Sequence, residues 1–346
     1  GVNTRTNSRG TMFTTTGPED VDFSNEYTDW LPNANMTVRF SPEWQLRLAA
    51  TQTRTRPTFQ QLNPALSLGS PPNCASLPPG VDCIRTGSGG NPFLKPLDSN
   101  NYDASIEYYF SRNGFASAAV FHRDMRGFIA NRAVEFPDPD PETGLPLVIS
   151  GPANTRKGKI RGFEAQVSSF FDWEFVPTWA RAFGAQANVT YIDAKADFSL
   201  FCPPTAETCE PQPGAPNATI RRLRIPDVSK WTYNLVGMYE AGGLTLRLAY
   251  NRRSKFPEGG LAERDGFFTL QGRGQPVSRL DWSSSYTVTD NVTVFFDWTN
   301  ILKKPFKSDI VRVNYAAGEP VGDPEIFPMV ARFEESIMTG GVRFRF

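Results

Sequence analysis

Residues 183–191 read FGAQANVTY, and this short stretch decides the fold. Its odd positions, from Phe183 to Tyr191, are apolar or aromatic, whereas its even positions carry glycine, glutamine, asparagine and threonine. Successive side chains of a β-strand point to opposite faces, so this alternation predicts a strand with one apolar face and one polar face. The same pattern returns in LTLRLAYN at 244–251, LDWSSSYTV at 280–288 and VTVFFDW at 292–298. No comparably long stretch repeats with the period of a helix, so the sequence predicts an all-β chain.

The composition excludes several classes of protein. The chain has 346 residues, and its 36 lysines and arginines balance 36 aspartates and glutamates, so no net charge draws it to nucleic acid. It contains no run of about eighteen apolar residues, so no transmembrane helix is expected. A mean hydropathy of −0.38 is still compatible with a membrane protein. A β-barrel with a wet lumen is polar at every second strand position.

The connections between strands alternate between short and long. Short turns are expected at 41–43, 111–114, 241–243 and 289–291, with one of middling length near 172–179. Long polar loops, expected to stand without structure in water, are placed at 14–26, 57–100, 128–157, 195–227, 254–275 and 303–331. Tight turns at one end and long loops at the other are typical of an outer-membrane β-barrel.

About twelve strands are predicted, and together they make residues 1–346 part of a single barrel domain. They are placed at 3–14, 27–40, 43–56, 101–111, 114–127, 158–171, 181–194, 228–240, 244–253, 276–288, 292–302 and 332–346. Open sheet edges are not tolerated in hydrocarbon, so the strands are expected to belong to a closed ring. With the C-terminus on the short-turn side, parity places the long loops outside the cell and the short turns in the periplasm.

The two faces of these strands differ in the way a membrane wall requires. Leu246, Val294 and Phe344 are assigned to the lipid face, with tryptophan or tyrosine near the strand ends. Arginines fall on the opposite, polar face; these are Arg39, Arg47, Arg247, Arg343 and Arg345. A β-sandwich or a propeller also alternates, and this alternative requires the apolar face to be covered by a second layer of protein.

The cysteines form two close pairs, Cys74 with Cys83 and Cys202 with Cys209, in stretches rich in proline. Local pairs inside loops predict disulfides formed in an oxidising compartment. A zinc site built from all four thiolates would need paired C-x2-C spacings, which the sequence lacks. Each short closure would stabilise its loop by about 2–3 kcal/mol.

An ordered set of short strings resembles the C-terminal half of TonB-dependent outer-membrane receptors, most closely the subgroup found in Caulobacter- and Xanthomonas-type bacteria. The strings are YTDWLP at 27–32, LRLAA at 46–50, TRTRP at 53–57, LNP at 62–64, GNPFLKP at 90–96, NYD at 101–103, EYYF at 107–110, FHRDM at 121–125, GFE at 162–164, NVTY at 188–191 and GVRFRF at 341–346. Each string alone is weakly specific, but their order spans nearly the whole chain.

The resemblance implies a function for the intact protein. It implies a barrel of about 22 strands around an N-terminal plug, with a TonB box that the TonB–ExbB–ExbD machinery pulls. Such a receptor imports a scarce nutrient, here a ferric siderophore or an oligosaccharide, into the periplasm. No plug or TonB box is present in this sequence, so the chain is expected to be the C-terminal part of the barrel. A passive porin with a self-contained twelve-stranded barrel is the alternative.

Candidate substrate contacts are basic and aromatic residues near the long loops. Clustered guanidinium groups could draw an anionic ligand, although they could equally pair with nearby acids or with lipopolysaccharide phosphates. A tryptophan could stack on a sugar ring or belong to an interfacial aromatic girdle. The candidates are Arg54, Arg56, Arg222, Arg224, Arg252 and Trp231.

No catalytic residue, metal site or cofactor is predicted. The single histidine, His122, would be the base of an outer-membrane hydrolase, but no G-x-S-x-G string or other nucleophile signature accompanies it. One histidine and loop cysteines do not make a set of metal ligands.

Overall fold

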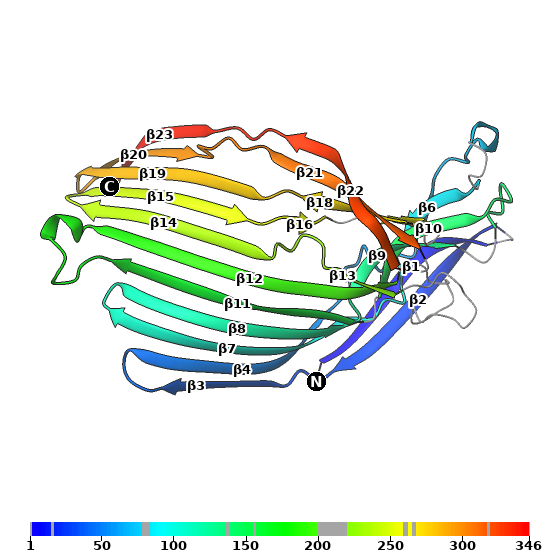
Figure 1. Cartoon of the computed structure of the whole chain (residues 1–346). Coiled ribbons are helices and arrows are strands. Elements are labelled where there is room, and N and C mark those ends of the chain that lie inside the picture. Colours follow the sequence, from blue (N-terminus) through cyan, green and yellow to red (C-terminus); the bar gives the residue numbers. More distant parts are fainter. Residues whose placement is uncertain are drawn as a thin grey trace.

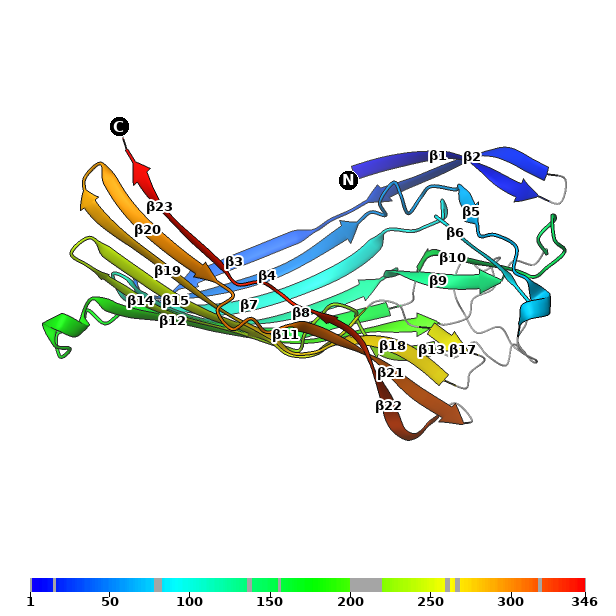
Figure 2. The same cartoon turned by 90° about the horizontal axis from the view of Figure 1, so that it is seen from above.

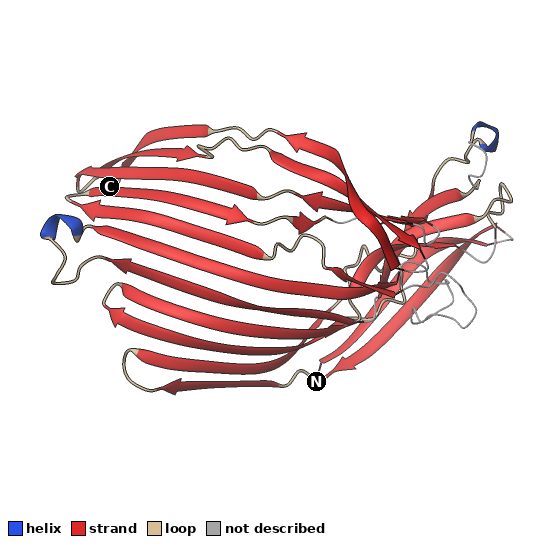
Figure 3. Ribbon diagram, viewed as in Figure 1, coloured by secondary structure: helices blue, strands red, loops and turns tan. Residues whose placement is uncertain are grey.

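The computed structural model describes the whole chain except residues 1, 15–16, 78–82, 136–138, 155–156, 200–219, 259–261, 265–267, 317–318 and 346. Strands dominate it, as the sequence predicts (Figure 3). Short 3-10 turns occur at Cys74–Ser76 and Thr178–Ala180. None of the described helices is long and apolar enough to cross a membrane.

One 12-stranded antiparallel sheet forms the body of the molecule, and its strand order follows the chain (Figure 1). The strands are β3 (Asn33–Arg39), β4 (Trp44–Thr55), β7 (Leu97–Ser111), β8 (Gly114–Arg126), β11 (Lys157–Phe170), β12 (Phe183–Ser199), β14 (Trp231–Ala241), β15 (Leu244–Arg253), β19 (Val277–Thr289), β20 (Val292–Thr299) and β23 (Ile337–Phe344), with β13 (Ile220–Arg224) paired to β12. Eleven of the twelve predicted strands therefore form in this sheet, with bounds shifted by up to six residues.

The sheet is curved and open (Figure 2). Among the described residues, β3 and β23 each have a neighbour on one side only. The tight turns gather at one end of the sheet and the long connections at the other, as predicted (Figure 1). A self-contained twelve-stranded porin would need β3 and β23 to pair, which they do not. The sheet therefore fits the predicted part of a larger barrel.

The N-terminal region differs from the prediction. The expected loop at 14–26 is mostly strand, because β1 (Val2–Thr14) and β2 (Gly17–Asp29) pair along their whole length as a separate two-stranded sheet. The strand predicted at 27–40 is interrupted at 30–32, between β2 and β3. Pro32 lacks an N–H to donate, which favours a break there.

The long connections are not structureless, and that expectation was wrong. Two of them share a four-stranded sheet made of β5 (Leu66–Leu68), β6 (Arg85–Gly89), β10 (Leu147–Asn154) and β9 (Ile129–Glu135), in which β10 pairs parallel to β6. Two others share a sheet of β16 (Phe256–Pro257), β17 (Ala262–Arg264), β18 (Phe268–Gly274), β21 (Phe306–Ala316) and β22 (Glu319–Arg332). Pairing between loops satisfies backbone groups that a single loop would leave to water.

The main hydrophobic cluster lies where the strands meet the long connections. Met125, Ala194, Ala196 and Ile225 are buried together, with Ile160 packed against them. Within the described ranges, no second layer of protein covers the apolar side chains of the large sheet. Val294 is 43% exposed, and Phe344 at the end of β23 is 64% exposed.

Candidate functional site

The register of the large sheet aligns apolar side chains into rows across one face. One row reads Leu46, Ile106, Ala118, Ala165, Val189 and Tyr233 on successive strands. Val120 and Leu235 on the same face are 58% and 51% exposed. A contiguous exposed apolar face that extends across six strands indicates contact with a membrane or a partner protein. The β-sandwich alternative required these side chains to be covered, and they are not.

Aromatic rings border this face at both ends of the strands. At the short-turn end, Trp44 stacks on Tyr108 with ring centres 4.2 Å apart. At the long-loop end, the rings of Tyr191 and Trp231 lie 4.7 Å apart, and Trp231 stacks on Tyr233. Phe183 and Tyr191 are eight residues apart, about 26 Å along β12. An outer-membrane barrel has an apolar band of about 25 Å between aromatic girdles.

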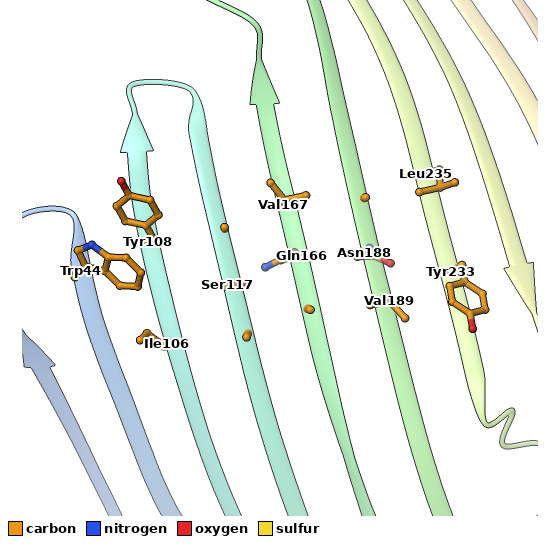
Figure 4. A pocket seen from close by; sticks show the side chains of 14 residues that line it. Trp44, Ile106, Tyr108, Ser117, Gln166, Val167, Asn188, Val189, Tyr233 and Leu235 are labelled. Carbon is orange, nitrogen blue, oxygen red and sulfur yellow. The ribbon is translucent and has the colours of Figure 1, made fainter. Parts of the chain in front are cut away.

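Between the two aromatic rows, the apolar face is hollowed. The hollow has a volume of about 510 Å³ and crosses β4, β7, β8, β11, β12 and β14 (Figure 4). Trp44, Tyr108 and Tyr233 lie at its margins, whereas Ala116, Ala118, Ala165 and Ala187 line it. Small side chains in one patch of the sheet leave this space between larger neighbours.

The opposite face is polar and internally paired. The Glu107 carboxylate accepts hydrogen bonds from Gln45, from Arg47 Nε at 2.9 Å and from the Tyr109 hydroxyl at 2.7 Å. Arg123 Nη2 donates to Asp103 Oδ1 at 2.6 Å. The register also puts Arg47, Arg247 and Arg343 on this face, as predicted. Such a surface suits water, and it would line the lumen of a barrel.

A buried ion pair holds two of the long connections together. Arg85 Nη1 donates to Asp140 Oδ2 at 2.8 Å and to Glu142 Oε2 at 2.7 Å, and Asp140 is 1% exposed. Burial by itself raises the pKa of Asp140, but hydrogen bonds from Thr143 and Arg85 outweigh it, so the pKa is lowered from its ordinary value. The pair therefore stays ionised at neutral pH.

The disulfide predicted between Cys74 and Cys83 is present, with their Cα atoms 5.4 Å apart. It closes a loop within the same connection that carries β5 and β6. The other predicted pair, Cys202 with Cys209, lies outside the described residues.

The predicted substrate contacts do not converge on one site. Arg54 pairs with Asp98 and with the buried Asp29, which Arg56 also approaches at 3.5 Å. Arg222 Nε lies 3.8 Å from Asp197, while Arg224 donates to the Val228 carbonyl at 2.9 Å.

By the strand register, five of the six predicted contacts lie on the apolar side of the sheet, at its long-loop end. They are Arg54, Arg222, Arg224, Arg252 and Trp231. Trp231 belongs to the aromatic row there. Contact of these residues with a substrate stays a prediction.

Sequence reasoning missed the charged residues beside these arginines. Beyond Tyr191, the alternation of β12 continues with Asp193 and Lys195 on the same side, and Arg161 of β11 stands opposite Asp193. The signal was present in the string YIDAKAD at 191–197, where the aromatic Tyr191 is followed at every second position by a charged residue.

In the part of the chain that the structure describes, the side-chain partner of His122 is a carboxylate and not a nucleophile. Its Nε2 atom lies 3.1 Å from Asp124 Oδ2. Within the described ranges, none of its hydrogen bonds is made with a serine or cysteine side chain. In the same part of the chain, no three His, Cys, Asp or Glu side chains are grouped to hold a metal ion.

The sequence matches the family described as TonB dependent receptor-like, beta-barrel, over residues 2–301. No curated protein sequence matches it.

The fold is similar to those of solved receptors and transporters. The ferric enterobactin receptor PfeA of Pseudomonas aeruginosa, in a mutant form with enterobactin, has a TM-score of 0.55 at 13% identity, covering 94% of this chain and 42% of that chain. The siderophore receptor PirA of Acinetobacter baumannii gives 0.53 at 16% identity, covering 93% and 43%. The copper transporter OprC gives 0.53 at 14% identity, covering 96% and 41%.

The chain thus spans about two fifths of the length of these solved proteins. Members of the matched family are transporters of the outer membrane and not enzymes. Because the family match covers most of the sequence and the two-faced sheet agrees with it, the chain belongs to the TonB-dependent receptor-like β-barrel family.

Proposed function

We propose that the protein containing this chain imports a scarce nutrient across the outer membrane into the periplasm, with energy delivered through TonB. The observation that carries the proposal is the difference between the two faces of the large sheet. One face is apolar and exposed between two aromatic rows, and the other carries polar side chains that pair with one another. The family match supports a receptor rather than a passive pore. Residues 1–346 would form the C-terminal portion of its barrel.

Partners and orientation belong to the same proposal. TonB, ExbB and ExbD would act through a plug outside this chain. The long connections with their two small sheets would face the exterior, and the short turns and C-terminus would face the periplasm. The disulfide between Cys74 and Cys83 supports this orientation, because it lies at the long-loop end and needs an oxidising environment.

The cargo we propose is a small molecule, a ferric siderophore in preference to an oligosaccharide. Titles of similar structures name an enterobactin receptor and a siderophore receptor, which is said of those proteins. Arg56, which follows the last residue of β4 and lies 3.5 Å from Asp29, stays a proposed contact of this cargo.

Growth of a deletion strain tests this function. Deleting the gene should abolish growth when a single ferric siderophore supplies the iron, and deleting the TonB gene should have the same effect. Restoring the gene should rescue growth only where TonB is present. Growth that depends on the gene but not on TonB would refute an energised receptor and support a passive pore.

A further inference from the structure

The border of the large sheet at β23 continues past the membrane wall as β22. The chain runs from β22 through a short link at 333–336 into β23, so the two strands are consecutive parts of one border (Figure 1). Among the described strands, β22 pairs with β21 on one side, and β23 pairs with β20 on one side. Every residue from 320 to 333 is exposed. One free edge therefore extends along both strands.

The link between β22 and β23 lies at the outer limit of the apolar face. Trp298, near the long-loop end of β20, stands opposite Met338 at the beginning of β23. The Trp298 Nε1 atom donates to Ser336 Oγ at 2.7 Å. The amide of the buried Asn300 donates to the Glu335 carbonyl at 3.1 Å. The link is thus fixed at the aromatic level of the wall, and β22 lies beyond that level.

Prolines recur at every fourth position of β22, as Pro320, Pro324 and Pro328. Pro320 and Pro328 stand opposite Tyr315 and Asp309 of β21 in the ladder. A proline has no N–H to donate, so within a paired edge strand it takes the positions whose N–H would face away from the partner. The missing donors therefore belong to the free edge of β22.

The regular stretch at 325–328 shows how much pairing this edge loses. These four residues pair one by one with residues 312–309 of β21. Backbone N–H groups alternate between the two sides of a strand, so Phe327 faces β21 and Ile326 faces the free edge. Ile326 lies two residues from Pro324 and two from Pro328. An incoming strand would therefore find one donor at three successive pairing positions.

The sequence of β23 has the opposite character. Its eight residues, Ile337–Phe344, read IMTGGVRF and contain no proline, so each of them can donate. Inside hydrocarbon an unpaired sheet edge is not tolerated, whereas outside it water satisfies the same groups. In water a long exposed edge is instead a hazard, because it can template the addition of another chain. Each half of the border thus carries the sequence that its surroundings require.

We infer that this border is divided into a docking edge, Ile337–Phe344, and a guarded edge, 320–332. The docking edge accepts the strand that continues the barrel wall, as an antiparallel neighbour along its whole length. The guarded edge excludes every added strand, both the outward continuation of that neighbour and an extended segment of another protein. The wall of the assembled barrel therefore parts at the level of Trp298, and the hairpin of β21 and β22 stands free beside the seam.

Hydrogen exchange at single-residue resolution, on the intact detergent-purified protein, tests both edges. After correction for intrinsic rates, the Ile326 amide should exchange at least about a hundredfold faster than the Phe327 amide, because Phe327 donates to β21. The amides at 338–343 should all be protected, because β23 is paired on both sides in the whole barrel. Equal protection of Ile326 and Phe327 would place a strand on β22 and overturn the guarded edge. Fast exchange at alternate positions of 338–343 would overturn the docking edge.

Restoring the missing donors tests whether the prolines are the cause. The probe is a labelled peptide of residues 306–316, the β21 sequence that already pairs antiparallel with β22. The double variant Pro324→Ala/Pro328→Ala should bind this peptide at least about tenfold more tightly than the unchanged protein, because two N–H donors are restored. The matched control Pro42→Ala/Pro177→Ala makes the same change in two short turns and should bind as the unchanged protein does.

Equal binding of the peptide by the two double variants would overturn the role of the prolines. The exchange measurement needs no substitution, so it decides the guarded edge even where a variant fails to fold. Both experiments use the barrel without cargo and without TonB, so their outcome does not depend on what the protein imports.

Discussion

Arg85 ties together the two long connections that form the four-stranded sheet of β5, β6, β10 and β9. Its guanidinium joins the connection that carries β6 to the one that carries Asp140 and Glu142, and its Nε donates to the Gly69 carbonyl at 3.1 Å. Neither connection alone could satisfy these groups. Nothing in the local sequence announces the contact, because 55 residues separate Arg85 from Asp140.

Replacing Arg85 with alanine should loosen this sheet while the large sheet stays folded. The substitution leaves the buried Asp140 carboxylate unpaired, and removing one partner of a buried pair costs much more than breaking an exposed pair. Hydrogen exchange at 85–89 and 147–154 should accelerate by at least about tenfold. Arg332→Ala, which breaks the exposed pair with Glu334, is the control and should leave these amides unchanged. Equal effects of the two variants would contradict the role of Arg85.

Acid should weaken the ion pair between Arg85 and Asp140. Because the pKa of Asp140 is lowered in the folded state, its stabilising contribution is complete above the ordinary carboxylate pKa of about 3.9. That contribution is lost as the pH falls from there through the lowered value. Protection of the amides at 147–154, corrected for intrinsic exchange, should therefore decline below about pH 4. Asp140→Asn should remove this dependence; a decline that persists in that variant would assign it to another group.

At the scale of the strand, neighbouring residues should differ sharply in what they tolerate. Leu235 and Asn234 are adjacent on β14, yet Leu235 lies midway along the apolar face and Asn234 bonds to Asn188 on the polar face. Leu235→Arg should cost about 2–4 kcal/mol, because an arginine at the bilayer midplane is poorly solvated. Asn234→Arg should cost much less. Heat-modifiable migration of the assembled barrel on gels measures the difference, and similar losses in both variants would argue against a lipid face.

Strands were predictable from the sequence where one physical rule governs every residue. In FGAQANVTY the alternation follows from lipid on one side and water on the other, so β12 could be placed within a few residues. The same rule fails beyond the membrane, where both faces are wet. The strands β6, β9 and β10 were missed there, because their partners are set by pairing between distant loops. The hollow in the apolar face was missed for another reason: alanine satisfies the apolar pattern as well as leucine does, so the pattern carries no information about volume.

At the scale of the whole molecule, the large sheet has two edges that hydrocarbon does not tolerate. Unpaired N–H and C=O groups each cost several kcal/mol away from water, and in the described part of the chain β3 and β23 each leave one edge unpaired. The polypeptide of residues 1–346 alone should therefore fail to form a conducting pore in planar bilayers. Steady conductance from this polypeptide would instead support a self-contained porin.

On the orientation that we propose, the four-stranded sheet of β5, β6, β10 and β9 has a consequence for recognition from outside the cell. Its parallel pair joins 85–88 to 147–150, so the surface it offers is assembled from segments far apart in the chain. An antibody or phage that binds this surface would recognise a discontinuous epitope. A linear peptide copied from either segment would reproduce only half of it, so immunogens for this face need the folded pair.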